Sequence, residues 1–161
     1  MEEEELPGAM GTSASLALRL GQIIFSSASL LFMSFHVEFY SYTSYCYLVS
    51  VMGLVIPWSM ALALLDAYSI FLKSLPRRPR IMLIVIIGDW VLSFLSLAGA
   101  CSTASVTELL IEAGEAYCPF KLCRRYQLSA ATAFFSWFLS FGSSLFNLWL
   151  LPSLYPSPPY I

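Results

Sequence analysis

Three ionisable residues lie inside long apolar segments of this chain: Arg19, Asp66 and Asp89. A charged side chain in hydrocarbon costs about 2.5–3.5 kcal/mol on insertion scales, so each of these groups is expected to face protein and to have a partner. Two kinds of chemistry fit one arginine and two aspartates in such a setting. A guanidinium can hold a carboxylate through two parallel hydrogen bonds as a structural ion pair, and carboxylates in membranes also relay protons or cations.

The three residues are expected at similar depth. Counted at about 1.5 Å per residue from the inner end of each apolar run, Arg19 lies roughly 8 Å deep, Asp66 roughly 9 Å and Asp89 roughly 12 Å. This shared layer predicts contact between Arg19 and Asp89. Gln22 follows Arg19 on the same helical face and is predicted to satisfy a leftover donor. Two aspartates against one arginine keep a proton or cation path open as the alternative, although the scattered serines form no polar ladder toward the outer side.

The cysteines and the single histidine allow few kinds of disulfide, metal or catalytic site. Cys118 and Cys123 flank four residues in a predicted outer loop, where oxidising conditions favour a disulfide between them. Zinc is the weaker alternative, because no further cysteine or histidine lies near. His36 is the only histidine, so we expect no histidine-based metal or catalytic cluster and no cofactor. Cys46 and Cys101 are expected to be buried as small apolar residues.

The elements that carry these residues are four apolar runs, each long enough to cross a bilayer. They cover approximately residues 14–35, 45–72, 81–101 and 128–151. The chain is 58% hydrophobic and 11% charged with mean hydropathy +0.75, which leaves no room for an appended soluble domain. The sequence predicts a single all-α domain over residues 1–161, an integral membrane four-helix bundle. Its outer loops are expected at about 36–44 and 102–127, and its inner loop at 73–80.

Basic residues predict the orientation. Four of the eight Lys and Arg residues lie in the short connection 73–80, which the positive-inside rule assigns to the cytoplasm together with both termini. The same cations could also bind anionic lipid head groups. The acidic start, Glu2–Glu5, differs from the basic start of a cleavable signal peptide, so we expect it to be retained as a cytoplasmic tail.

Helix shape and helix contacts can also be predicted. Pro57 predicts a bend in the second run, with Ser59 as the candidate donor to the carbonyl that the proline leaves unpaired. Small residues let helices approach closely in lipid, either within one bundle or between two copies. They recur in the third and fourth runs, as Gly88, Ser93, Ser96, Ala98, Gly99 and Ala100, and as Ser129, Ala130, Ala131, Ala133, Gly142, Ser143 and Ser144.

Several segments resemble the plant Casparian strip membrane protein-like (CASP-like) family. They are residues 18–22, 45–54, 88–90 and 95–102, and the Cys118–Cys123 element followed by Arg124. The resemblance spans about residues 12–151 and implies four membrane helices with cytoplasmic termini and a core similar to MARVEL domains. The family pattern has an arginine in the first helix and an aspartate in the third, which correspond here to Arg19 and Asp89. Asp66 is not part of this family pattern and is a candidate site residue only because it lies inside an apolar run.

The resemblance also implies a function. It points to a non-catalytic plant plasma-membrane scaffold that forms homodimers, heterodimers and larger oligomers with related four-helix proteins. Such a scaffold organises a membrane domain and recruits secreted cell-wall-modifying enzymes. Residues 36–43 lack the loop signature of the founding members, so a generic scaffold role is the prediction. No catalytic constellation or nucleic-acid-binding pattern is evident, and the expected partners are related membrane proteins and lipids. The alternative is a small proton or ion channel or transporter that uses the Arg19, Asp66 and Asp89 cluster.

Overall fold

The computed structural model describes residues 12–35, 41–72, 79–114 and 119–150. Within these ranges it contains four helices, namely α1 (Ser13–Ser34), α2 (Thr43–Leu72), α3 (Pro79–Glu112) and α4 (Phe120–Leu150), and no strand. All four helices are long and apolar enough to cross a membrane. The predicted all-α membrane bundle is therefore confirmed. The acidic start, His36, most of the basic connection and Cys118 lie outside the described residues.

Helix α1 shows why the bundle forms with its polar side inward. The side chain of Thr12 caps the helix, since its Oγ1 accepts a hydrogen bond of 3.3 Å from the backbone N–H of Ser15. The buried residues recur every three or four positions and are mostly polar: Ser15, Arg19, Gln22, Ser26, Ser29 and Met33. Leucine and isoleucine side chains occupy the outward face. Lipid solvates that face well, so hydrogen bonding and close packing hold the helices together.

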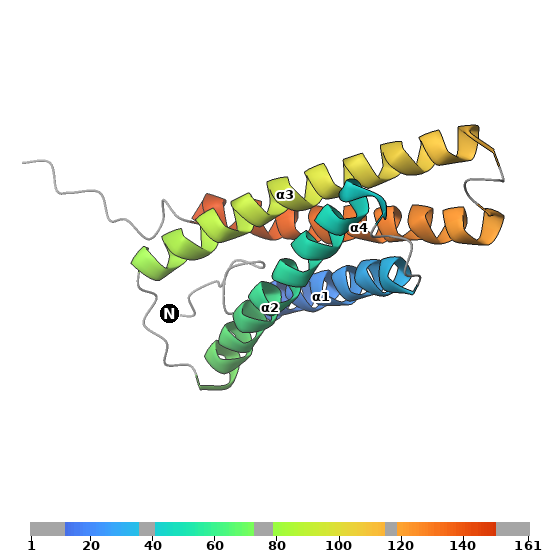
Figure 1. The fold of residues 1–161 in the computed structure, drawn as a ribbon. Coiled ribbons are helices and arrows are strands. Elements are labelled where there is room, and N and C mark those ends of the chain that lie inside the picture. Colours follow the sequence, from blue (N-terminus) through green and yellow to red (C-terminus); the bar gives the residue numbers. More distant parts are fainter. Residues whose placement is uncertain (1–11, 36–40, 73–78, 115–118, 151–161) are drawn as a thin grey trace, which may run out of the picture.

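The helices form a four-membered ring in cross-section. Helix α1 packs mainly against α2 and α4, and α3 packs against the same two helices, so α1 and α3 occupy a diagonal (Figure 1). Helix α2 ends and α3 begins at the end of the bundle where α1 begins (Figure 1). We call this half of the bundle the Arg19 half, and the opposite half, where α2 begins, the Tyr45 half.

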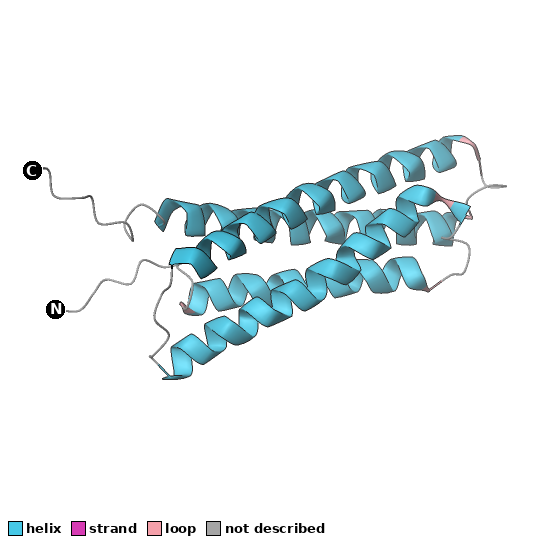
Figure 2. Ribbon diagram, turned by 60° about the vertical axis from the view of Figure 1, so that its left-hand side comes forward, coloured by secondary structure: helices cyan, strands magenta, loops and turns pink. Residues whose placement is uncertain are grey.

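Helices α3 and α4 are longer than the sequence predicted. The third apolar run was expected to end at 101 and the fourth to begin near 128, whereas α3 continues to Glu112 and α4 already begins at Phe120. Most of the predicted outer loop 102–127 is therefore helical, and both helices extend past the end of α1 (Figures 1 and 2). The hydropathy of a segment indicates where it leaves the hydrocarbon of the membrane, which need not be where the helix ends. The helices continue because Thr107 of α3 and Tyr126 of α4 remain buried in these extensions, where both contact Tyr45 of α2.

An apolar core fills the Tyr45 half. The buried cluster consists of Met33, Tyr45, Leu48, Met52, Ala100, Tyr126 and Ala133. The rings of Tyr45 and Tyr126 lie 4.5 Å apart between centroids, and the Tyr45 hydroxyl lies 3.1 Å from that of Thr107. The phenol therefore packs as an aromatic group while its polar end has a hydrogen-bond partner.

Most of the small residues in α3 and α4 serve packing within the bundle. Gly88 faces Trp58, and Gly99 faces Leu48 and Tyr47. Ser93, Ser96, Ala100, Ser129, Ala130, Ala133, Ser143 and Ser144 are buried. Ala98 and Ala131 remain exposed on the outer surface of the bundle. Cys101 is also an exposed free thiol, so the prediction that it is buried was wrong; Cys46 is partly buried.

Candidate functional site: a buried ion pair between diagonal helices

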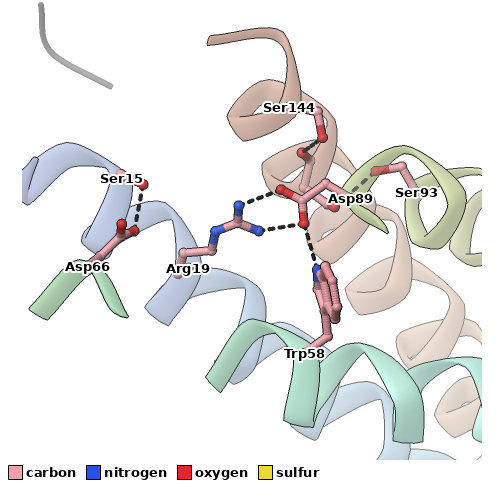
Figure 3. Close-up of polar contacts among 8 residues, drawn as sticks. Ser15, Arg19, Trp58, Asp66, Asp89, Ser93 and Ser144 are labelled. Carbon is pink, nitrogen blue, oxygen red and sulfur yellow. Dashed lines mark hydrogen bonds and ion pairs between the residues drawn. The ribbon is translucent and has the colours of Figure 1, made fainter. Parts of the chain in front are cut away.

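Arg19 and Asp89 join the two diagonal helices through a bidentate ion pair. The Nη1 of Arg19 donates to Oδ1 of Asp89 at 2.8 Å, and Nη2 donates to Oδ2 (Figure 3). The side chains are 1% and 0% exposed. The parallel geometry suits the planar guanidinium, and the pairing neutralises a charge that neither residue could carry alone in a buried site.

A tryptophan from α2 completes the site. The indole Nε1 of Trp58 donates to Oδ1 of Asp89 at 2.9 Å, so one carboxylate receives donors from α1 and α2 while it belongs to α3 (Figure 3). Gly88 makes room for this indole, since a Cβ built on it would lie 2.3 Å from Cζ2 of Trp58. Sequence reasoning missed Trp58, because its position beside Pro57 does not indicate which neighbour the indole faces.

Asp66 is held by a hydroxyl group of α1. Ser15 Oγ donates to Oδ2 of Asp66 at 2.7 Å, and the Asp66 side chain is 1% exposed. The guanidinium of Arg19 extends toward Asp89 (Figure 3). The three charges thus share a region of the bundle, with a hydroxyl from α1 holding the second carboxylate.

The predicted contact of Gln22 with a spare donor of Arg19 is absent. Gln22 is buried on the predicted face of α1. However, its Oε1 and the Nε of Arg19 both lack a hydrogen-bond partner among the described residues. The hydroxyl of Ser59 also has no hydrogen-bond partner among the described residues, so it does not donate to the carbonyl near Pro57. Helix α2 continues through the proline. Helix spacing predicted the faces of these side chains correctly but not their partners.

Serine hydroxyls form cross-helix pairs along the interior. Ser26 and Ser136 place their Oγ atoms 2.6 Å apart. Ser29 and Ser129 each donate to the other's backbone carbonyl, at 2.9 and 2.8 Å. A further pair joins α3 to α4, with 2.9 Å between the Oγ atoms of Ser93 and Ser140. The serines are scattered in the sequence, and the fold brings these hydroxyls together from positions that lie far apart along the chain.

The arrangement provides charge compensation and helix cross-linking. Within the described ranges, no group of three or more His, Cys, Asp or Glu side chains could hold a metal ion. The Asp89 carboxylate accepts three donors from two other helices, which fixes both its position and the relative positions of those helices. A buried ion pair of this kind is costly to break from one side, because the remaining charge has no partner.

One cysteine of the predicted outer-loop pair can be placed. Cys123 is buried near the start of α4 and is disulfide-bonded. Cys118 lies outside the described residues, so the Cys118–Cys123 pairing stays a prediction.

Comparison with known proteins identifies relatives over nearly the whole chain. The Casparian strip membrane protein domain matches residues 8–139. CASP-like protein 5C2 of Arabidopsis thaliana is 58% identical over 152 residues, which cover 94% of this chain and 99% of the relative. CASP-like protein 5C1 of the same plant is 61% identical over 146 residues, 89% of this chain and 93% of its own length. CASP-like protein 5B1 of Ginkgo biloba is 47% identical over 150 residues, 93% and 84% of the two chains. No solved structure matches the chain significantly.

Proposed function

Because this chain belongs to the Casparian strip membrane protein domain family, we propose that it is a non-catalytic scaffold of the plasma membrane. It assembles with copies of itself and with related four-helix proteins to organise a membrane domain, and it recruits secreted cell-wall-modifying enzymes to that domain. The chain is a multi-pass membrane protein with four membrane-spanning helices.

The observation that carries the proposal is the threefold coordination of Asp89. Its carboxylate accepts hydrogen bonds from Arg19 and Trp58, so it connects α3 to α1 and α2 at once. A carboxylate that carries protons or ions through a membrane must exchange partners, whereas this one is held by fixed donors. Such a site suits a rigid assembly unit better than a carrier.

The helical extension of α3 and α4 offers a surface for assembly. Glu108 and Glu112 are exposed on α3, and Lys121, Arg124 and Arg125 are exposed on α4. None of these five takes part in an ion pair with any described residue. Opposite charges on two adjacent helices allow the acidic edge of one copy to meet the basic edge of the next, which favours specific lateral association.

A charge-swap experiment tests this assembly. Two differently tagged copies that both carry Glu108→Lys and Glu112→Lys are cross-linked in native plant membranes and compared with a wild-type pair. We expect the two swapped copies to lose cross-linking to each other, because neither retains an acidic edge. A swapped copy should regain cross-linking with a copy that carries Lys121→Glu and Arg124→Glu. Arg80→Glu, at the opposite end of α3, is the matched control and should leave cross-linking unchanged. Monomers throughout would contradict the scaffold proposal.

The alternative is a small proton or ion channel or transporter that uses Arg19, Asp66 and Asp89. The observation in its favour is the near-complete burial of two carboxylates in one half of the bundle. Proteoliposomes distinguish the two functions. We expect no protein-dependent proton or ion flux; a sustained flux that a folded Asp66→Asn or Asp89→Asn variant abolishes would replace the scaffold proposal with transport.

A further inference from the structure

We propose that the Arg19 half of the bundle encloses a chain of ordered water molecules that forms part of the folded structure. Several buried polar side-chain atoms have no hydrogen-bond partner among the described residues. In this half they are Arg19 Nε, Gln22 Oε1, Ser59 Oγ, Ser143 Oγ and both amide atoms of Asn147. Each of these residues is at most 1% exposed, so the atoms face the interior of the bundle. The inference does not depend on the scaffold function.

The register of α1 against α2 places two of these groups at one level. Ser15 and Asp66 are hydrogen-bonded, which aligns the two antiparallel helices at that point. Two helical turns further along α1 is Gln22, and two turns back along α2 is Ser59. An unpartnered acceptor and an unpartnered hydroxyl therefore lie opposite each other on neighbouring helices. A water molecule that donates to Gln22 Oε1 and exchanges a second hydrogen bond with Ser59 satisfies both.

The register of α1 against α4 gives the same result. The Ser26–Ser136 contact aligns these antiparallel helices. Two turns back along α1 is Arg19, and two turns forward along α4 is Ser143. Arg19 Nε is a donor only and Ser143 Oγ can accept, so a bridging water fits here as well. One turn further toward the same end of the bundle, Asn147 on α4 comes level with Ser15 and with the Asp66 carboxylate that Ser15 holds.

The chemistry of these atoms selects water as the ligand. Some of the unpartnered atoms are donors, some are acceptors, and the hydroxyls are both. A lipid tail or an apolar ligand would leave all of them without a hydrogen bond. A cation is disfavoured beside the guanidinium of Arg19. Buried polar groups in proteins are nearly always satisfied, and a water that bonds to two or more of them is the usual solution where protein partners are lacking.

The Tyr45 half does not need such waters to the same extent. Its serines are paired across helices, as in Ser26–Ser136 and Ser29–Ser129, and Tyr45 is paired with Thr107. Thr103 Oγ1 is the one unpartnered buried side-chain atom of this half among the described residues. The unpartnered atoms, and with them the proposed waters, are therefore concentrated in the Arg19 half.

Water-edited solid-state NMR on the full-length wild-type protein in lipid bilayers tests the inference directly. Magnetisation from water should reach the side-chain amide of Asn147 and the Nε–H of Arg19 at least several times faster than the backbone amides of Ser29 and Ala133, which serve as the dry reference. Arg19→Lys assigns the arginine resonance. Transfer to Asn147 and Arg19 as slow as to the reference residues would overturn the inference.

Substitutions provide a second and independent test. Gln22→Met removes the acceptor at nearly constant volume. If the site is hydrated, the bound water loses a partner and Tm falls; if the site is dry, an unsatisfied group is removed and Tm rises. Combined with Ser59→Ala, the effect should be less than the sum of the single effects, because both residues hold the same water. Ser29→Ala combined with Ser59→Ala is the matched control and should be additive. A rise in Tm for Gln22→Met, or additive effects at Gln22 and Ser59, would contradict a shared water.

Discussion

The two halves of the bundle satisfy their buried polar groups in different ways. In the Tyr45 half, hydroxyls pair with one another and with carbonyls across helices, around the packed rings of Tyr45 and Tyr126, which are tilted against each other. In the Arg19 half, a charged pair and a tryptophan form the central contact, while several neighbouring polar atoms have no hydrogen-bond partner within the part of the chain that the structure describes. Hydroxyls are small and interchangeable, so neighbouring helices can pair them readily. A large guanidinium imposes one geometry and leaves the groups around it to find other partners.

The largest expected effect comes from breaking the ion pair on one side. Asp89→Asn leaves Arg19 with a buried uncompensated charge and should cost about 3–5 kcal/mol of folding free energy, seen as lost folded yield in detergent or nanodiscs. Replacing both residues, as Arg19→Met with Asp89→Leu, should recover much of that loss. Additive losses in the double variant would show that the two charges do not stabilise each other.

The second-largest loss of stability is expected at the contact between Gly88 and Trp58. Gly88→Ala places a methyl group against Trp58, and it should destabilise the protein by about 1–3 kcal/mol through overpacking. Thermal unfolding in nanodiscs measures this. Gly53→Ala is the matched control in α2, where an added Cβ meets nothing within 4 Å, and it should be neutral or slightly stabilising. Equal effects of the two substitutions would argue against close packing at Gly88.

A smaller effect is expected in the Tyr45 half. Ser26→Ala and Ser136→Ala each remove one hydroxyl of a cross-helix pair, and their coupling in a double-mutant cycle should be about 0.6 kcal/mol, the typical value for interhelical hydrogen bonds in membranes. Pairing Ser26→Ala with Ser140→Ala gives the control, because Ser140 is paired with Ser93. A coupling as large as that of Arg19 with Asp89 would remove the distinction between the two halves.

The smallest effect concerns the cysteines. Alkylation of non-reduced protein followed by mass spectrometry should label Cys46 and Cys101, whose side chains are thiols and not part of a disulfide, and leave Cys118 and Cys123 linked. Cys123→Ser should leave the Arg19 half unchanged, since it acts near the start of α4, and should release one additional free thiol. Labelling of Cys118 by a membrane-impermeant reagent in the untreated wild type would contradict the pairing.

Apolar runs determine the number and kind of elements in this chain. A run of about twenty apolar residues has few structural options in lipid, because every backbone polar group must be satisfied internally. The extensions of α3 and α4 could not be predicted in the same way. They depend on Thr107 and Tyr126 packing against neighbouring helices beyond the apolar runs.

The sequence by itself determined that Arg19 and Asp89 are buried, face inward and need a partner, because a lone charge in hydrocarbon is too costly. Their shared depth also predicted that they contact each other, and the structure shows this contact. Only the tertiary structure decided that the contact crosses the diagonal of the bundle, that Trp58 joins it over Gly88, and that Ser15 holds Asp66. It also decided that the serines pair across helices and that Gln22 Oε1 and Ser59 Oγ have no hydrogen-bond partner among the described residues. The physical reason is that depth and helical face follow from position along one helix, whereas a partner depends on the register and rotation of several helices together.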